Sequence, residues 1–289
     1  MAEILDGKKV SEEILQEVRA EIDRIKAKNG DVPGLAVIMV GDDPASKAYV
    51  NKKHQACQSV GMYSEQHIMP GTTSTDELLR KVRDLNSSPL IHGILVQLPL
   101  PGHISEAVIL EAVTPEKDVD GFHPINVGRL SNGEDGLFPC TPVGVIELLR
   151  RSGVNLIGRR ALVIGRSTIV GKPLAQLLLR EHATVTIAHS RTQNLPEEVG
   201  RAEIVCAAMG KPQFVKGEWI ATGAVVVDIG TNVIPDASRP SGKRMVGDVD
   251  FETAAPRAGW ITPVPGGVGP MTIAMLLKNT LRARNQQKP

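Results

Sequence analysis

The stretch Ala161–Leu174, ALVIGRSTIVGKPL, constrains the fold most, because it predicts a strand, a glycine turn and a helix in direct succession. The apolar run Ala161–Ile164 has strand character, the chain turns at Gly165, and an apolar-periodic helix follows at Pro173–Arg180. A turn of this kind lets a phosphate approach backbone N–H groups at a helix N-terminus, where the peptide dipoles favour negative charge. The stretch therefore predicts a dinucleotide-binding unit.

The glycine pattern by itself leaves a second interpretation open. In the fingerprint G-x-G-x-x-G, the middle glycine is replaced here by Ser167, and the last one, Gly171, is displaced by one position. Any α/β protein can need a glycine such as Gly165 for a tight turn from strand to helix. The cofactor assignment therefore depends on the strand that follows.

That strand, Thr184–Ala188, continues into His189-Ser190-Arg191 and has no acidic residue at its end. In an NAD site an Asp or Glu roughly 20 residues past the glycines binds the ribose 2′-hydroxyl, whereas an Arg accommodates a 2′-phosphate. The hydroxyl of Ser190 and the guanidinium of Arg191, with Arg166 in the first turn, suit a phosphate dianion. We therefore predict NADP as the cofactor.

Strands and helices alternate along the rest of the chain. Before the dinucleotide unit we predict helices at Lys8–Lys28, Ala45–Val60, Ser74–Asn86, Ser105–Val113 and Val143–Arg151, and strands at Gly34–Val40, Ser64–Ile68 and Gly93–Val96. After it we predict strands at Ile204–Ala207, Ala224–Ile229 and Gly259–Thr262, and a long amphipathic helix at Met271–Arg284. Such alternation implies mostly parallel sheets with right-handed crossovers.

The predicted fold class is therefore α/β, with two α/β lobes and a cleft between them. We expect residues 1–142 and 272–289 to form a catalytic domain that binds the substrate, with the last helix returning to it. Residues 143–271 are expected to form a Rossmann-like domain that binds NADP. A cleft at the carboxyl ends of two parallel sheets is where α/β proteins bind ligands.

Composition excludes several classes of function. A net charge of +1 and 3% aromatic residues argue against a nucleic-acid surface, so we expect small-molecule partners. There is no run of about 18 apolar residues and no signal peptide pattern, so no membrane partner is expected. Cys57, Cys140 and Cys206 are far apart, which is typical of free thiols in the cytoplasm. The seven His residues form no ligand pattern, and we predict no metal.

The helix after the first long strand carries a candidate catalytic amine. Tyr49, Lys53 and Cys57 fall at four-residue spacing, so they share one face. On a largely uncharged face near a cleft, Lys53 would be desolvated and would lose its proton more easily. The alternative is that Lys53 is a surface lysine whose stem passes Tyr49, whereas the neighbouring Lys52 is on the surface in either case.

Two further segments place polar groups after apolar runs. Gln97 ends the strand GILV and precedes two prolines, where it either points at a ligand or caps the turn, and one X-Pro bond there can be cis. Asp118 and Asp120 precede Gly121, and their side chains either point to one side of an extended segment or cap the turn. We expect at least one of the two acids to cap the turn.

Seven motifs occur in order between Gly41 and Thr272: GDDPASKAYVNKK, GILVQLPLP, PEKDVDGF, CTPVGV, GRSTIVGKP, AHSRT and TPVPGGVGPMT. Together they resemble the bifunctional methylenetetrahydrofolate dehydrogenase and methenyltetrahydrofolate cyclohydrolase family. The resemblance implies that Lys53 is the catalytic lysine, that Gln97 hydrogen-bonds it, and that both activities are present. It further implies that Tyr49 packs on the folate and orients it, and that Asp120 binds the pterin ring.

The resemblance extends to the remaining binding residues. It implies NADP contacts at Gly165, Arg166, Ser167, Ser190, Arg191 and Thr231. It implies folate contacts at Leu98, Pro265, Gly266 and Gly267, in addition to Tyr49, Gln97 and Asp120. Thr141 and Pro142 match a further loop of the cleft. Because family members are usually homodimers joined through the second domain, we also expect a homodimer.

The implied function is oxidation of 5,10-methylenetetrahydrofolate by NADP⁺ and hydrolysis of the methenyl product to 10-formyltetrahydrofolate, a one-carbon folate interconversion. Hydride transfer mainly needs the methylene carbon positioned against the nicotinamide. Hydrolysis needs proton transfer near a cation, and that cation favours a neutral amine at Lys53. Two alternatives are a dehydrogenase whose lysine no longer works, and a cofactor-sensing or interaction protein on the same fold.

Overall fold

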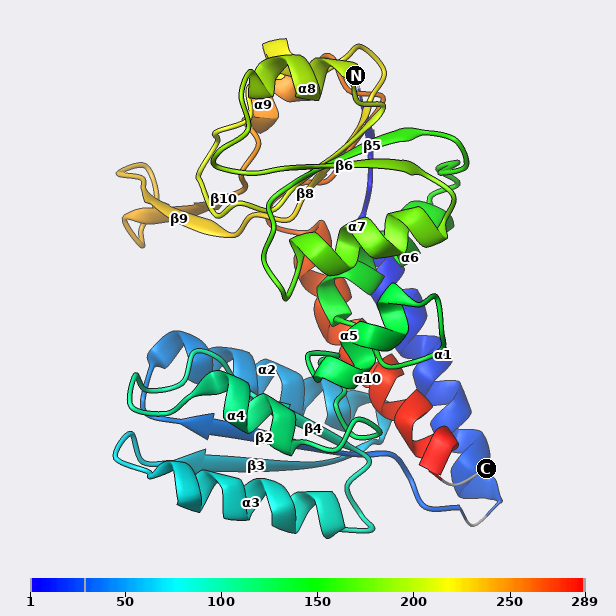
Figure 1. The fold of residues 1–289 in the computed structure, drawn as a ribbon, viewed down its shortest axis with the longest axis vertical. Helices are drawn as coiled ribbons and strands as arrows, with labels where there is room; N and C mark the ends of the chain where they lie inside the picture. Colours follow the sequence, from blue (N-terminus) through cyan, green and yellow to red (C-terminus); the bar gives the residue numbers. More distant parts are fainter. Residues whose placement is uncertain (1, 29, 288–289) are drawn as a thin grey trace. The chain divides into compact units, whose positions relative to one another are not determined.

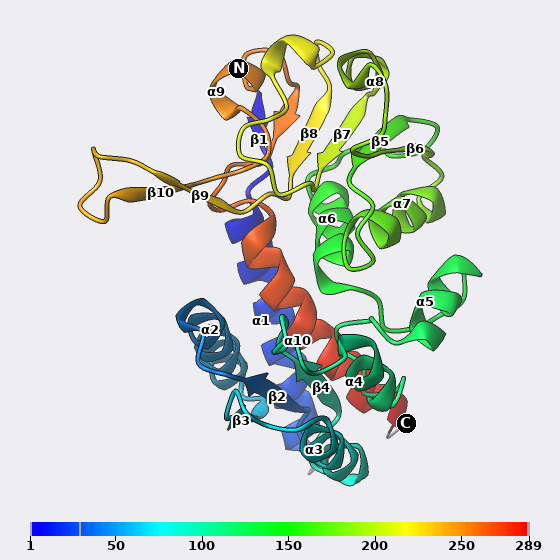
Figure 2. The same ribbon diagram turned by 60° about the vertical axis from the view of Figure 1, so that its left-hand side comes forward.

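The computed structural model describes residues 2–28 and 30–287, which form two compact units (Figures 1 and 2). The six-stranded unit comprises Met1–Ser11 and Thr141–Thr272, and the three-stranded unit comprises Glu12–Cys140 and Ile273–Pro289. Two long helices, α1 (Gly7–Ala27) and α10 (Val268–Gln287), have residues in both units.

The three-stranded unit is built on a parallel sheet with the strand order β3-β2-β4. The central strand β2 (Gly34–Val40) is buried along its whole length, as a continuous apolar run between two layers of helices should be. Its neighbours are β3 (Tyr63–Met69) and β4 (Gly93–Val96). The helices of this unit are α2 (Pro44–Val60), α3 (Thr75–Ser87), α4 (Glu106–Ala112) and α5 (Pro124–Ser131). In Figure 1, α2 and α3 lie on opposite faces of the sheet.

Local sequence signals set the limits of α2, the helix that carries Lys53. Asp43 is its N-cap and accepts a hydrogen bond from the backbone N–H of Ser46 at 2.7 Å, and Pro44 occupies the first turn. The helix ends at Gly61, which has a φ of +76° that a residue with a Cβ adopts only with strain. These caps fix where the helix begins and ends, and hence which residues face the sheet.

The six-stranded unit is built on a sheet with the strand order β1-β11-β8-β7-β5-β6, and all neighbouring strands in it are parallel. Its strands are β1 (Glu3–Ile4), β5 (Arg160–Ile164), β6 (Thr184–Ala188), β7 (Ile204–Ala207), β8 (Val225–Asp228) and β11 (Trp260–Ile261). Its helices include α6 (Cys140–Arg151), α7 (Gly171–Arg180), α8 (Leu195–Arg201) and the short α9 (Phe251–Ala254). A buried apolar cluster between sheet and helices includes Leu162, Val199, Val205 and Val226.

An antiparallel hairpin, β9 (Asn232–Pro235) with β10 (Lys243–Val246), projects from this unit away from the parallel sheet (Figure 2). Neither this hairpin nor α5 and α8 was predicted from the sequence. The two helices have only eight and seven residues, which is too short for apolar periodicity to distinguish them from loops. Helix α10 begins three residues before its predicted start, because Pro270 lies in its first turn, where proline is tolerated.

The division of the chain differs from the prediction at the N-terminus. Residues through Ser11 were predicted to lie in the first domain, but they belong to the six-stranded unit, because β1 pairs with β11 through Glu3↔Trp260 and Ile4↔Ile261. A two-residue strand gives no periodic signal in the sequence. The residues of α10 from Ile273 onward belong to the three-stranded unit, as predicted for the last helix.

Candidate functional site

Lys53 is a buried amine in the three-stranded unit. It lies on the same face of α2 as the buried residues Val50 and Cys57, whereas Lys52 is exposed. The Lys53 side chain is 9% exposed, so its interpretation as a surface lysine is wrong. Burial lowers the pKa of Lys53, while the nearby Asp120 and Cys140 raise it to a smaller extent. Since the effect of burial is the larger, the neutral form of Lys53 is more favoured than that of a lysine at the protein surface.

Gln97 holds this amine through a directed hydrogen bond. It follows β4 directly, at the carboxyl end of that strand, and its Oε1 accepts from Lys53 Nζ at 2.9 Å. The Gln97 amide nitrogen donates to the carbonyl oxygen of Leu98 at 2.7 Å, which orients the amide so that its oxygen faces the amine. The Leu98–Pro99 peptide bond is cis, as expected for one bond of this segment. Gln97 therefore contacts a functional group rather than only capping a turn.

Asp118 and Asp120 have different roles in the structure. Asp118 is 4% exposed and accepts hydrogen bonds from the backbone N–H groups of Phe122 and His123, at 3.2 and 2.8 Å, and from Asn126 Nδ2 at 2.9 Å. It is therefore the acid that caps the turn, which passes through Gly121 with a φ of +72°. The Asp120 carboxylate accepts no hydrogen bond among the described residues, and its charge acts on Lys53.

The ionisable groups around Lys53 form one coupled cluster. Burial raises the pKa of Asp120 to about 6, the charge of Lys53 opposes this rise, and Asp118 adds to it. Cys140 is 4% exposed, and burial raises the pKa of its thiol well above the ordinary value. Its Sγ donates to the carbonyl oxygen of Val119 at 3.3 Å. At neutral pH the cluster thus consists of an amine, an ionisable carboxyl group and a protonated thiol.

Tyr49 leaves about half of its ring open beside this cluster. Its side chain is 49% exposed, and Lys52 Nζ lies 5.9 Å from the centre of its ring. An exposed ring one helical turn from the buried Lys53 provides a surface on which a planar molecule can stack. Leu98, which was predicted to contact the substrate, is half-buried next to Gln97.

The glycine turn of the six-stranded unit has the geometry of a close backbone approach. Gly165 has a φ of +136°, and a Cβ there would lie 2.2 Å from the carbonyl oxygen of Ala208. A Cβ at Gly171 would lie 2.3 Å from the carbonyl oxygen of Gly165. Ser167, in the position of the middle glycine, accepts hydrogen bonds at 3.2 Å from the backbone N–H groups of Val170 and Gly171. Ser167 therefore stands where the fingerprint has a glycine, and its hydroxyl accepts from backbone N–H groups at the start of α7.

A cavity of about 410 Å³ lies at this turn, at the carboxyl ends of β5, β6 and β7. Four of the six predicted cofactor residues line it, namely Gly165, Arg166, Ser167 and Ser190. Arg191 and Thr231 are exposed and are not among its lining residues. Ligands of α/β proteins bind at this end of a parallel sheet, so the cavity is a candidate nucleotide site.

Lys211 and Phe214 are among the lining residues that were not predicted as cofactor contacts. The Lys211 Nζ lies 5.0 Å from the centre of the Phe214 ring, and both side chains line the cavity with Arg166. Asp248 holds their loop, because its carboxylate accepts hydrogen bonds from three successive backbone N–H groups at 2.6, 2.9 and 2.8 Å. The donors are Met209, Gly210 and Lys211. Only the glycine of the sequence MGKP could have indicated this turn.

The loop Pro265-Gly266-Gly267 packs closely against the backbone of Gly7 and Lys8 within the six-stranded unit. The Val264–Pro265 bond is cis, and Gly266 has a φ of +111°. The backbone N–H of Lys8 donates to the carbonyl oxygen of Gly266 at 3.0 Å, and a Cβ at Gly7 would lie 1.7 Å from the carbonyl oxygen of Gly267. Only glycine fits such an approach.

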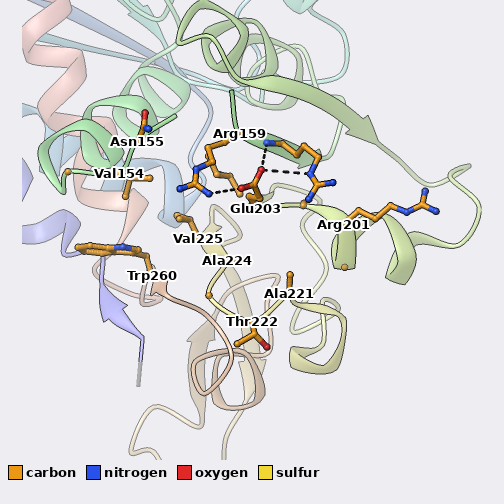
Figure 3. A pocket seen from close by; sticks show the side chains of 16 residues that line it. Val154, Asn155, Arg159, Arg201, Glu203, Ala221, Thr222, Ala224, Val225 and Trp260 are labelled. Carbon is orange, nitrogen blue, oxygen red and sulfur yellow. Dashed lines mark hydrogen bonds and ion pairs between the residues drawn. The ribbon is translucent and has the colours of Figure 1, made fainter. Parts of the chain in front are cut away.

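A second cavity, of about 440 Å³, lies at the opposite edge of the same sheet (Figure 3). It is lined by residues at the amino ends of β5, β7, β8 and β11, including Arg160, Ile204 and Val225. The carboxylate of Glu203 accepts from Arg159 at 2.5 Å and from the backbone N–H of Arg160 at 3.1 Å. These groups already satisfy one another at the end of the sheet where ligands are not expected, so we assign this cavity no part in the chemistry.

The described residues contain no group of three His, Cys, Asp or Glu side chains placed to hold a metal ion. Within the same residues, none of the helices is both long enough and apolar enough to cross a membrane.

Comparison with known proteins agrees with this arrangement of sites. Residues 5–120 match the family model described as tetrahydrofolate dehydrogenase/cyclohydrolase, catalytic domain. Residues 139–288 match the NAD(P)-binding domain of the same family. The bifunctional protein FolD of Moorella thermoacetica is 56% identical over 282 residues, which cover 98% of each chain.

Two solved structures are similar along nearly the whole chain. The bifunctional FolD enzyme of Campylobacter jejuni is 43% identical with a TM-score of 0.94, covering 99% of this chain and 100% of that one. The FolD enzyme of Trypanosoma brucei, solved with an NADP cofactor and an inhibitor, is 42% identical with the same TM-score, covering 99% and 98%.

Proposed function

This chain belongs to the tetrahydrofolate dehydrogenase/cyclohydrolase family, and from that premise we propose how its residues divide the work of two reactions. It is a bifunctional enzyme that oxidises 5,10-methylenetetrahydrofolate to the methenyl compound and hydrolyses that compound to 10-formyltetrahydrofolate. We assign proton transfer and most folate contacts to the three-stranded unit, and the nicotinamide cofactor and the folate contacts of Pro265, Gly266 and Gly267 to the six-stranded unit. The observation that carries this assignment is the buried Lys53 amine, hydrogen-bonded to Gln97 and facing the charge of Asp120.

In the cyclohydrolase reaction, Lys53 acts on the water that attacks the methenyl carbon. Attack forms a C–O bond and releases a proton, which a neutral amine at Lys53 accepts. The adduct then collapses: its hydroxyl loses a proton as the C=O bond forms, the bond from that carbon to N5 breaks, N5 takes a proton, and the formyl group stays on N10. The cationic substrate itself favours the neutral form of Lys53, while Gln97 keeps the amine in place.

Asp120 and Tyr49 orient the folate. A carboxylate without a hydrogen-bond donor among the described residues is available to accept from pterin N–H groups, and Asp120 is such a group. The half-exposed ring of Tyr49 stacks on the folate. Leu98, Pro265, Gly266 and Gly267 provide further folate contacts, and the glycines let backbone approach the substrate closely.

NADP⁺, when bound, would supply the acceptor for the hydride that leaves the methylene carbon. We propose that its phosphates bind at the turn Gly165–Ser167, and that Arg166 and Ser190 in the cavity recognise the 2′-phosphate. Arg191 and Thr231 contribute from the rim. The NADP bound to the Trypanosoma brucei relative supports this cofactor, since that chain is 42% identical to this one.

We further propose that the enzyme is a homodimer joined through the six-stranded unit. Strand β6 lies at the edge of the sheet. The side chain of Ile187 on β6 is 43% exposed, and that of Leu179 on α7 is 64% exposed. Unpaired edges and exposed apolar side chains favour association. Sedimentation velocity of the wild type and of Ile187→Lys tests this, since the variant should shift toward monomer.

We also assign a cytoplasmic location, where its three free, buried cysteines stay reduced.

A two-wavelength assay tests the proposal directly. Methylenetetrahydrofolate and NADP⁺ are mixed with the enzyme, and NADPH formation is followed together with the appearance and decay of the methenyl compound. NADPH with rapid methenyl decay is the expected result. Methenyl that accumulates to its uncatalysed lifetime would remove the role of Lys53 and leave a dehydrogenase, and binding of NADP without any turnover would indicate a cofactor-sensing protein.

A further inference from the structure

Asn279 lies on α10, far in sequence from Lys53 and Asp120, yet it is hydrogen-bonded to the segment that carries Asp120. The side chain is 5% exposed. Its Nδ2 donates to the carbonyl oxygen of Val119 at 2.9 Å and to that of Phe138 at 3.0 Å, and it lies 3.6 Å from Cys140 Sγ. One amide group thus joins the segment next to Asp120 to the segment that ends at Cys140.

The bond to Val119 bears on Asp120 through covalent geometry. The carbonyl oxygen of Val119 and the N–H of Asp120 belong to the same planar peptide group, so a fixed oxygen also fixes the backbone from which the Asp120 side chain leaves. This oxygen accepts twice, from Asn279 and from the Cys140 thiol at 3.3 Å. The peptide is therefore held from two directions.

The other side of this peptide is equally constrained. Asp118 is held by three hydrogen bonds at the turn and pairs with Ile94 on β4 in a parallel bridge, where the Ile94 N–H donates to the carbonyl oxygen of Lys117 at 2.7 Å. At Gly121 a Cβ would lie 2.4 Å from the carbonyl carbon of Phe138, so the two segments are in direct backbone contact. Between these fixed points, Asn279 is the side chain that satisfies both the Val119 and the Phe138 carbonyl groups.

We propose that Asn279 is a positioning residue of the cyclohydrolase site, which sets the distance between Asp120 and Lys53 by fixing the Val119–Asp120 peptide and the Phe138–Cys140 segment. This inference rests on the proposed roles of Lys53 and Asp120. Displacing a catalytic constellation by about 1 Å costs on the order of 10²-fold in rate. Without Asn279 the carboxylate is free to move away from the amine, and the carbonyl oxygens of Val119 and Phe138 each lose one donor.

The chain provides a matched control on the same helix. Gln287 Nε2 also donates to two carbonyl oxygens, those of His92 at 3.0 Å and Glu116 at 2.9 Å. Gln287→Ala therefore also removes two hydrogen bonds from an α10 side chain to backbone carbonyl groups of the three-stranded unit. Neither of these bonds involves the Val119–Asp120 peptide. Asn279→Ser, which keeps one donor, serves as the milder second variant alongside Asn279→Ala.

The experiment measures cyclohydrolase kcat across pH, the folate KM and the melting temperature for Asn279→Ala, Asn279→Ser, Gln287→Ala and Lys53→Met. We expect Asn279→Ala to lower kcat about 10- to 100-fold and to move the rising limb of its pH profile to lower pH, because the carboxylate that keeps Lys53 protonated has moved away. Asn279→Ser should fall between it and the wild type. Gln287→Ala should lower the melting temperature without changing the pH profile.

Three outcomes separate this inference from the proposed function. If Lys53→Met abolishes hydrolysis and the Asn279 variants keep the wild-type pH profile with no greater loss of kcat than Gln287→Ala, then Asn279 is only structural and the inference is wrong. If Asn279→Ala does not fold, the pH profile of Asn279→Ser decides by the same criterion. If Lys53→Met hydrolyses at the wild-type rate, the site assignment fails, and the role of Asn279 fails with it.

Discussion

The Lys53 cluster and the Gly165 turn, the two binding sites that we propose, both lie at carboxyl ends of parallel strands, yet they are built in opposite ways. Around Lys53 the side chains carry the chemistry: the amine is buried, its partner Gln97 is oriented, and pKa values are shifted. At Gly165 the backbone carries the site, with positive φ and close peptide contacts, and the charged side chains such as Arg166 are exposed.

The difference follows from the two tasks. Proton transfer near neutral pH needs a group whose pKa has moved toward the working pH, and burial moves the pKa of the Lys53 amine downward. Binding a dinucleotide needs fixed N–H donors and permanently charged groups, and an exposed guanidinium provides these without any shift in pKa. Substitutions should therefore change rate and pH dependence at the first site, and affinity at the second.

The largest effect should come from the buried amine. Lys53→Met should lower cyclohydrolase activity by ~10²- to 10⁴-fold, since the general base is lost, and leave part of the dehydrogenase activity. The matched control is Lys52→Met, because Lys52 precedes it on the same helix and is exposed. Methenyl hydrolysis and NADPH formation are measured separately for both variants. An equal loss of methenyl hydrolysis in Lys53→Met and Lys52→Met would contradict the assignment of the general base to the buried lysine.

The next effect should come from the exposed arginine. Arg166→Ala should weaken NADP binding by about 10- to 100-fold, because a charge-assisted hydrogen bond to phosphate contributes roughly 1.5–3 kcal/mol. NAD binding should change much less, since NAD has no 2′-phosphate. Dissociation constants for both cofactors are measured by titration, with Arg191→Ala, which lies outside the cavity lining, as the weaker comparison. Equal losses for NADP and NAD would contradict the assignment of Arg166 to the 2′-phosphate.

The backbone character of the turn predicts a stability effect. Gly165→Ala places a Cβ 2.2 Å from the Ala208 carbonyl oxygen at a φ of +136°, so it should cost about 1–3 kcal/mol of unfolding free energy and weaken NADP binding as well. Gly153→Ala is the control, because Gly153 has a φ of +75° but no atom within 4 Å of its Cβ position. Chemical denaturation of both variants gives the comparison. A smaller loss at Gly165 than at Gly153 would argue against a close contact there.

The smallest effect is a change in pH dependence. Hydrolysis should rise with pH as Lys53 loses its proton, and ionised Asp120 opposes that loss by raising the pKa of the amine. In Asp120→Asn this opposition is removed, so the rising limb of kcat should move to lower pH even though folate binding weakens. Asp120 itself has a pKa of about 6, so its carboxylate is mostly ionised at pH 7 and above in the wild type. A limb that moves to higher pH would show that the two groups are not coupled as described.

Apolar runs in the sequence predicted most of the long elements, and the motifs supplied the residues that we assign to the two sites. β2 and β4 were predicted with their observed bounds, because Gly and Pro flank uninterrupted apolar runs. The grouping of Lys53 with Gln97 came from the family resemblance, since spacing along α2 left the lysine's burial open. Lys211, Asp248 and Asn279 were missed because their importance arises from contacts between distant segments, such as Asn279 with Val119. No local pattern reports such contacts.

The pairing of β1 with β11 has a consequence for how the enzyme is made. The partners of Glu3 and Ile4, Trp260 and Ile261, are synthesised more than 250 residues later. At roughly 5–20 residues per second, the first strand waits on the order of 10–50 s for the strand it joins. The three-stranded unit waits as well, because Asn279 comes still later. A nascent chain halted before about residue 260 therefore lacks the partner of β1 as well as Asn279, and it should complete neither unit.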